Sequence, residues 1–67
     1  MKLRINGQQM EVQNDIQNVQ DLLASFQLQD RILVVELNGE IVSKEQYSTQ
    51  SIHDGDQVEI VHFVGGG

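Results

Sequence analysis

The chain has 67 residues, enough for one domain with a single core and no second lobe to enclose a deep substrate cleft. Ten acidic residues against four basic ones give a net charge of −6, which argues against nucleic-acid binding and favours a partner with a basic surface. Cysteine is absent, which excludes disulfides, thiolate metal ligands and thiol nucleophiles. No stretch approaches the roughly 18 apolar residues of a membrane span, and no signal peptide is recognisable. We therefore expect a cytoplasmic protein with no membrane partner.

The N-terminal segment has the alternation of a half-buried strand, in which Leu3 and Ile5 are the apolar positions. Asn6 and Gly7 follow, and both residue types tolerate the positive φ angles of a type I′ turn. Alternation resumes beyond the turn. Residues 2–13 therefore predict a β-hairpin.

Beyond Asn18 the apolar spacing changes to i, i+3, i+4 and i+7, which is one stripe of an amphipathic helix. The residues of this stripe are Val19, Leu22, Leu23 and Phe26. We expect a helix over residues 19–27, with the Asn18 side chain as its N-cap and the whole stripe in the core.

The centre of the chain predicts a strand over residues 32–37, because this run is rich in β-branched side chains and is apolar on both faces for most of its length. Asn-Gly at residues 38–39 predicts a turn, and residues 41–42 a short strand. Residues 43–46 match the Ser-x-x-Gln capping box and predict one helical turn.

The last predicted element is a strand that follows the turn signal at residues 54–56. Alternation places Val58, Ile60 and His62 on the face towards the helix, and Glu59, Val61 and Phe63 on the other face. Together these elements predict an α+β fold in one domain over residues 1–67. Its sheet is mixed, has four or five strands, and carries one main helix on one face.

Two features of the last strand suggest a docking surface. Val61 and Phe63 form an apolar pair on the expected outer face, although isolated surface apolar residues are also ordinary. Asp54, Asp56 and Glu59 are expected near the base of the C-terminal tail, where they would meet basic residues of a partner.

The C-terminus, residues 64–67, ends in three glycines, which add no packing and lose much conformational freedom on ordering. A frayed end or a cloning scar would explain them. A function that needs a thin, flexible tail explains them better, because Val64 and the glycines together reach roughly 13 Å when extended. Such a tail could thread the Gly67 carboxylate into a partner's narrow active site.

Five features of the chain together resemble those of a known family. They are the order of the elements, the Asn-Gly turn at residues 6–7, the segment 35–42, the turn at 54–56 and the ending at 62–67. The chain resembles the ubiquitin-like β-grasp sulfur carriers, and among them the carriers of thiamin biosynthesis. The terminal Gly66-Gly67 is the specific motif, whereas Gly65 stands where many relatives carry alanine.

The resemblance implies a protein co-substrate and not an enzyme. Gly67 would be the attachment site, converted to an acyl-adenylate by an adenylating enzyme of the ubiquitin-activating type that consumes ATP. A partner's persulfide would then displace AMP and leave a thiocarboxylate, whose sulfur passes to thiazole synthase. Val64, Gly65 and Gly66 would thread into the partner active sites, and the carrier itself would bind no cofactor.

Two alternatives stay open: a sulfur carrier for molybdopterin synthesis, or a β-grasp regulatory or binding module without covalent chemistry. A metal site is not expected, because His53 and His62 are nine residues apart with a turn beside the first of them, and they lack the i, i+4 spacing of a helical site.

Overall fold

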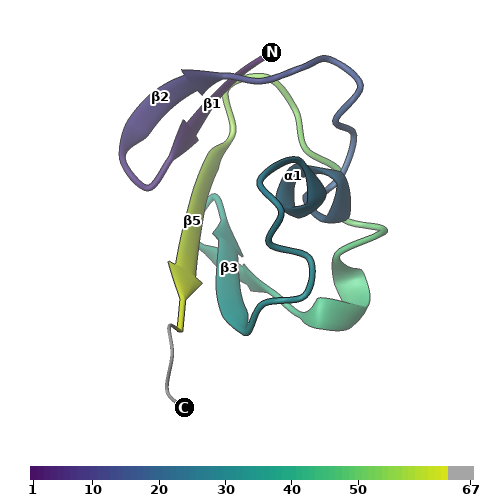
Figure 1. Ribbon diagram of the computed structural model, residues 1–67. Coiled ribbons are helices and arrows are strands. Elements are labelled where there is room, and N and C mark those ends of the chain that lie inside the picture. The colour runs from purple at the N-terminus through teal and green to yellow at the C-terminus, as the bar shows by residue number, and fades with distance from the viewer. Residues whose placement is uncertain (64–67) are drawn as a thin grey trace.

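The computed structural model describes residues 1–63 and contains a five-stranded sheet with one α-helix across one face (Figure 1). The elements in chain order are β1 (Lys2–Ile5), β2 (Gln8–Glu11), α1 (Val19–Ser25), β3 (Leu33–Leu37), β4 (Glu40–Val42), the 3-10 helix η1 (Lys44–Gln46) and β5 (Gln57–His62). The strand order is β2-β1-β5-β3-β4. β1 and β5 are parallel and the other pairs antiparallel, which confirms the predicted mixed sheet.

Both Asn-Gly turns form as predicted. Asn6 and Gly7 have φ angles of 50° and 82°, and Asn38 and Gly39 have 52° and 87°. These left-handed values are those of a type I′ turn, which joins antiparallel strands without splaying them. The predicted capping box is also present, with the Ser43 N–H donating to the Gln46 side chain at the start of η1.

The N-cap of α1 is confirmed, because Asn18 Oδ1 accepts a hydrogen bond of 2.8 Å from the Asp21 N–H. The predicted C-terminus is wrong by two residues, since α1 ends at Ser25. Gln27 has a φ of 61°, and the Leu28 N–H donates to the Leu23 carbonyl at 2.8 Å. This pattern is a Schellman motif, in which a left-handed residue reverses the chain at the end of a helix.

The Schellman motif explains why the prediction that Phe26 lies in the core is wrong. Phe26 is the C-cap, and its side chain is 36% exposed. The reversal at Gln27 brings Leu28 back against the core in its place, in the contact that usually accompanies this motif.

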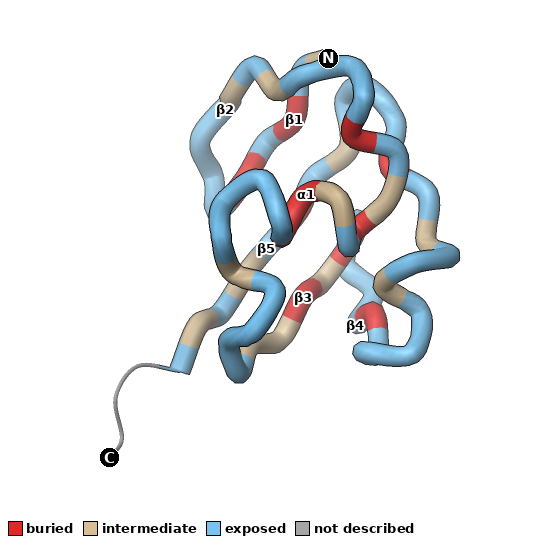
Figure 2. Tube along the Cα trace, turned by 45° about the vertical axis from the view of Figure 1, so that its right-hand side comes forward, coloured by how far each residue is buried: buried red, intermediate tan, exposed pale blue. Residues whose placement is uncertain are grey.

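The core lies between α1 and the sheet (Figure 2). Its buried members are Leu3, Ile5, Ile16, Val19, Leu22, Leu23, Val35, Leu37, Val42, Ile52 and Val58. Ile16 and Ile52 come from connecting segments, where a hydrogen bond from the Ile52 N–H to the Gln17 carbonyl holds the two connections together. Within residues 1–63, no helix has the length and apolar character needed to cross a membrane.

Candidate functional site

The predicted attachment site, Gly67, and the threading residues Val64, Gly65 and Gly66 lie outside the described residues. The structure does show where the last described residue is held. The Phe63 N–H donates a 3.1 Å hydrogen bond to the Ile32 carbonyl, so Phe63 continues the pairing of β5 with β3. The base of the tail is therefore fixed to the sheet at the start of β3.

The face of the sheet opposite α1 carries an exposed apolar patch. Val61 is 52% exposed and Phe63 59%, and Val61 is paired with Val34 across the strands. Ile41 on β4 is also exposed and is paired with Glu36 of the same face. We call Val34, Ile41, Val61 and Phe63 the outer patch. The predicted outward orientation of Val61 and Phe63 is confirmed, and their role in docking stays a prediction.

Glu59 lies beside the outer patch, directly opposite Glu36 on the neighbouring strand. Like charges at directly opposed positions are destabilising in a sheet. No described residue forms an ion pair with either carboxylate. A basic side chain from a partner would relieve this repulsion.

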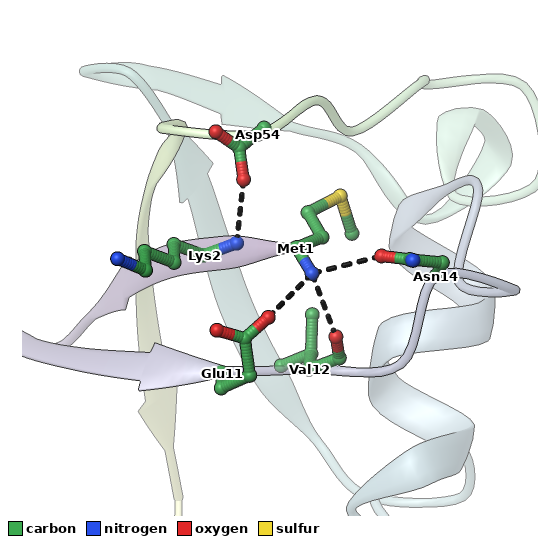
Figure 3. Close-up of polar contacts among 6 residues, drawn as sticks. All are labelled: Met1, Lys2, Glu11, Val12, Asn14 and Asp54. Atoms are coloured by element: carbon green, nitrogen blue, oxygen red, sulfur yellow. Dashed lines mark hydrogen bonds and ion pairs between the residues drawn. The ribbon is translucent and has the colours of Figure 1, made fainter.

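The expectation that Asp54 and Asp56 lie near the base of the tail is wrong. Both precede β5, whereas Phe63 follows it, and the six residues of β5 span about 20 Å. Figure 1 shows β5 running away from the end of the molecule where the chain begins. Asp54 is at that end, where its Oδ1 accepts the Lys2 N–H at 2.7 Å (Figure 3).

The two aspartates also have structural hydrogen bonds. Asp56 accepts from the His53 N–H at 2.8 Å and from the Asn38 side-chain amide at 3.1 Å. The Gly55 N–H donates to the Lys2 carbonyl at 2.7 Å. These bonds tie the turn at residues 54–56 to β1, to the turn that follows β3 and to the rest of its own loop. Asp54 and Asp56 therefore have a clear structural role, and of the three predicted acidic residues Glu59 is the one on the outer face beside the patch.

His62 is the last residue of β5, whereas His53 lies four residues before the strand begins at Gln57. Within residues 1–63, no group of three or more histidine, aspartate or glutamate side chains is arranged to hold a metal ion.

Asn6 has a role that the sequence interpretation missed. β1 pairs with β5 only at Arg4 and Ile5, but the Asn6 side chain then binds both backbone groups of Ile60. Its Oδ1 accepts from the Ile60 N–H at 2.7 Å, and its Nδ2 donates to the Ile60 carbonyl at 3.1 Å. A side-chain amide can do this because it has both a donor and an acceptor. Asn6 thereby extends the β1–β5 contact towards the outer patch.

Asn6→Gly is expected to lower the free energy of unfolding by about 1–3 kcal/mol, because glycine keeps the left-handed turn but leaves the Ile60 groups without the side-chain bonds. Urea titration would measure the change. Gly7→Ala is a useful comparison, since it strains the turn without removing these bonds. A loss below about 0.5 kcal/mol for Asn6→Gly would show that the amide contributes nothing to holding β5.

The helix-covered mixed sheet and its connectivity define a ubiquitin-like β-grasp domain. The sequence matches the ThiS family over residues 3–67. The chain therefore belongs to the ThiS family.

Individual relatives agree with this assignment. The sulfur carrier protein ThiS of Bacillus subtilis is 49% identical over 65 residues, which are 97% of this chain and 98% of that protein. A crystal structure of ThiS from Geobacter metallireducens is 38% identical, with a TM-score of 0.83 and full coverage of both chains. A thiazole synthase of Paramagnetospirillum magneticum is 42% identical over all 67 residues, which make up only 20% of its length.

Proposed function

We propose that this protein is the sulfur carrier of thiamin biosynthesis and that it delivers sulfur from a C-terminal thiocarboxylate on Gly67. The observation that carries the proposal is the family match, which extends through the diglycine to the last residue. The near full-length similarity to a sulfur carrier supports it. This match favours thiazole formation over the two alternatives, molybdopterin synthesis and a purely non-covalent module.

The chemistry begins with activation, because a carboxylate is a poor electrophile at neutral pH. The Gly67 carboxylate attacks the α-phosphate of ATP on an adenylating enzyme of the ubiquitin-activating type, and pyrophosphate leaves. The terminal sulfur of a partner's persulfide then forms a C–S bond to the acyl carbon, and AMP leaves. A second partner thiol cleaves the S–S bond and becomes oxidised to a disulfide, which releases the thiocarboxylate.

In this scheme every catalytic side chain belongs to a partner. This chain supplies the tail, in which Val64, Gly65 and Gly66 pass through a narrow entrance and Gly67 presents the reacting carbon. Glycine suits these positions because it has no side chain to obstruct the passage. The relative that combines a similar segment with the name thiazole synthase supports thiazole synthase as the sulfur acceptor.

Docking is assigned to the outer patch together with Glu59. The patch combines exposed apolar area with an unneutralised carboxylate pair, and it includes Phe63 at the base of the tail. A partner with an apolar surface and a basic side chain would complement both features. Docking here would place the tail directly at the partner's active site.

Intact-mass analysis tests the proposal. After incubation with ATP, the adenylating enzyme and a persulfide donor, the mass should rise by about 16 Da, the same nominal change as oxidation of one methionine. Fragmentation must therefore place the change at Gly67 and not at Met1 or Met10. An unchanged mass at Gly67 with an active enzyme and donor would refute the proposed chemistry.

A further inference from the structure

The sheet has an internal gap beside the start of β3. The last residue pair between β3 and β4 is Val35 with Val42, after which the chain leaves the sheet at Ser43 to form η1. Leu33 and Val34 are paired with β5 on one side. On their other side, no described strand lies next to them.

The backbone of Leu33 faces this gap. The bond from the Phe63 N–H to the Ile32 carbonyl shows that even-numbered residues of this segment point their backbone groups at β5. Because the direction alternates along a strand, the Leu33 N–H and C=O point the other way. Among the hydrogen bonds of residues 1–63 outside regular elements, none involves Leu33. Leu33 therefore offers one donor and one acceptor to an added strand.

A cavity of about 340 Å³ lies along this edge. Leu28 and Leu33, both half-buried, contribute apolar surface next to the buried Leu23, and Tyr47 lines the side next to η1. The combination of a free strand edge and an adjacent apolar cavity is the arrangement by which domains bind extended peptides, since the edge pairs with the peptide backbone and the cavity takes a side chain.

The charge of the cavity is opposite to that of the whole protein. Arg31 and Lys44, two of the four basic residues, line it, and none of the ten acidic residues does. Within residues 1–63, the ion pair that forms joins the N-terminal ammonium to Glu11, so neither Arg31 nor Lys44 is neutralised there. In a chain of net charge −6, this is a local site for carboxylates.

We propose that this β3-edge groove, formed by Leu23, Leu28, Arg31, Leu33, Lys44 and Tyr47, binds an extended acidic segment of a partner protein. The segment pairs its backbone with Leu33 and places an apolar side chain over the leucines. Its carboxylates meet Arg31 and Lys44. This inference goes beyond sulfur carriage and does not depend on the chemistry at Gly67.

The groove lies next to the base of the C-terminal tail. Ile32 lines the cavity and also accepts the hydrogen bond from Phe63, so the groove and the base of the tail lie on either side of the same residue. A partner segment held in the groove would keep that partner next to the tail. Val61 and Phe63 of the outer patch would stay accessible, whereas Val34 and Ile41 also line the cavity.

Titration of the full-length, ¹⁵N-labelled protein with a synthetic peptide tests the inference. The probe is acetylated and amidated Glu-Leu-Glu-Leu-Glu, and the comparison peptide has glutamine in place of each glutamate. We expect the largest amide shifts at Leu33, Lys44 and Tyr47 with the acidic probe. The dissociation constant should rise at least about fivefold in Arg31→Gln/Lys44→Gln. It should change less than about twofold in the matched control Lys2→Gln/Arg4→Gln, which alters the net charge equally.

Three results would overturn the inference. Equal weakening in both double variants would mean that only net charge matters. Shifts centred on Val61 and Phe63 would place the peptide on the outer patch. If the probe mainly displaced Gly66 and Gly67, with their amides moving to random-coil positions, the occupant of the groove would be the chain's own tail. Thermal melts of each variant distinguish lost binding from lost folding.

Discussion

Deleting Gly67 is expected to abolish sulfur transfer while leaving the free energy of unfolding unchanged within about 0.5 kcal/mol. Within residues 1–63 the last buried core residue is Val58, and a glycine has no side chain to add to an apolar core. The chemistry, by contrast, requires a carboxylate at the position that enters the adenylation site. Adding one alanine after Gly67 should have the same effect, because it moves the carboxylate and attaches it to a branched carbon. Thiazole formation with purified partners and a urea titration would measure the two quantities.

Gly65→Ala is the matched control for these tail variants. It adds a methyl group at Gly65, where the resemblance to the family leads us to expect that alanine is tolerated, and it should retain activity. If the deletion variant still supported thiazole formation, Gly67 could not be the sulfur attachment site. If Gly65→Ala were as inactive as the deletion, the whole tail and not its carboxylate would be the critical feature.

The fold could be predicted from the sequence wherever local chemistry and periodicity agreed. Each Asn-Gly pair tolerates positive φ at both turn positions, and Asn18 provides the side-chain acceptor of a helix cap; all three sites form as expected. Phe26 was wrongly assigned because apolar periodicity does not show where a helix stops. The left-handed residue that ends α1 is Gln27, which has none of the conformational preference of glycine.

The candidate site was only partly predictable for a different reason. Alternation along one strand correctly placed Val61 and Phe63 on the outer face. The neighbours Val34, Glu36 and Ile41 belong to other strands, so their positions depend on a pairing register that no single segment specifies. The β3-edge groove likewise exists because β4 ends at Val42, the partner of Val35, whereas β3 begins two residues before Val35, at Leu33. Such features come from tertiary structure and appear only when the strands are assembled.

Phe63→Ala is expected to weaken binding to the adenylating enzyme or thiazole synthase by about 2 kcal/mol or more, the usual loss for an aromatic residue that anchors an interface. Its side chain is 59% exposed on the outer patch, so little of it is packed in the free protein. The cost in stability should therefore lie well below the roughly 3–5 kcal/mol of a buried phenylalanine truncation. Binding titrations and urea titrations on the same preparation would measure both effects.

Leu22→Ala is the control, because Leu22 belongs to α1, is fully buried between the helix and the sheet, and does not reach the outer face. Removing its side chain leaves a cavity and should cost roughly 2–5 kcal/mol of stability. In conditions where the variant stays folded, its affinity for either partner should equal that of the unmodified protein, since the outer patch is on the opposite side of the sheet. The two variants should thus separate docking from folding.

If Phe63→Ala left both affinities unchanged, Phe63 would not be an anchor and docking would have to rest on other residues. If Phe63→Ala were as destabilised as Leu22→Ala, its side chain would be packed in the free protein, and the outer patch would lose the residue that joins it to the tail.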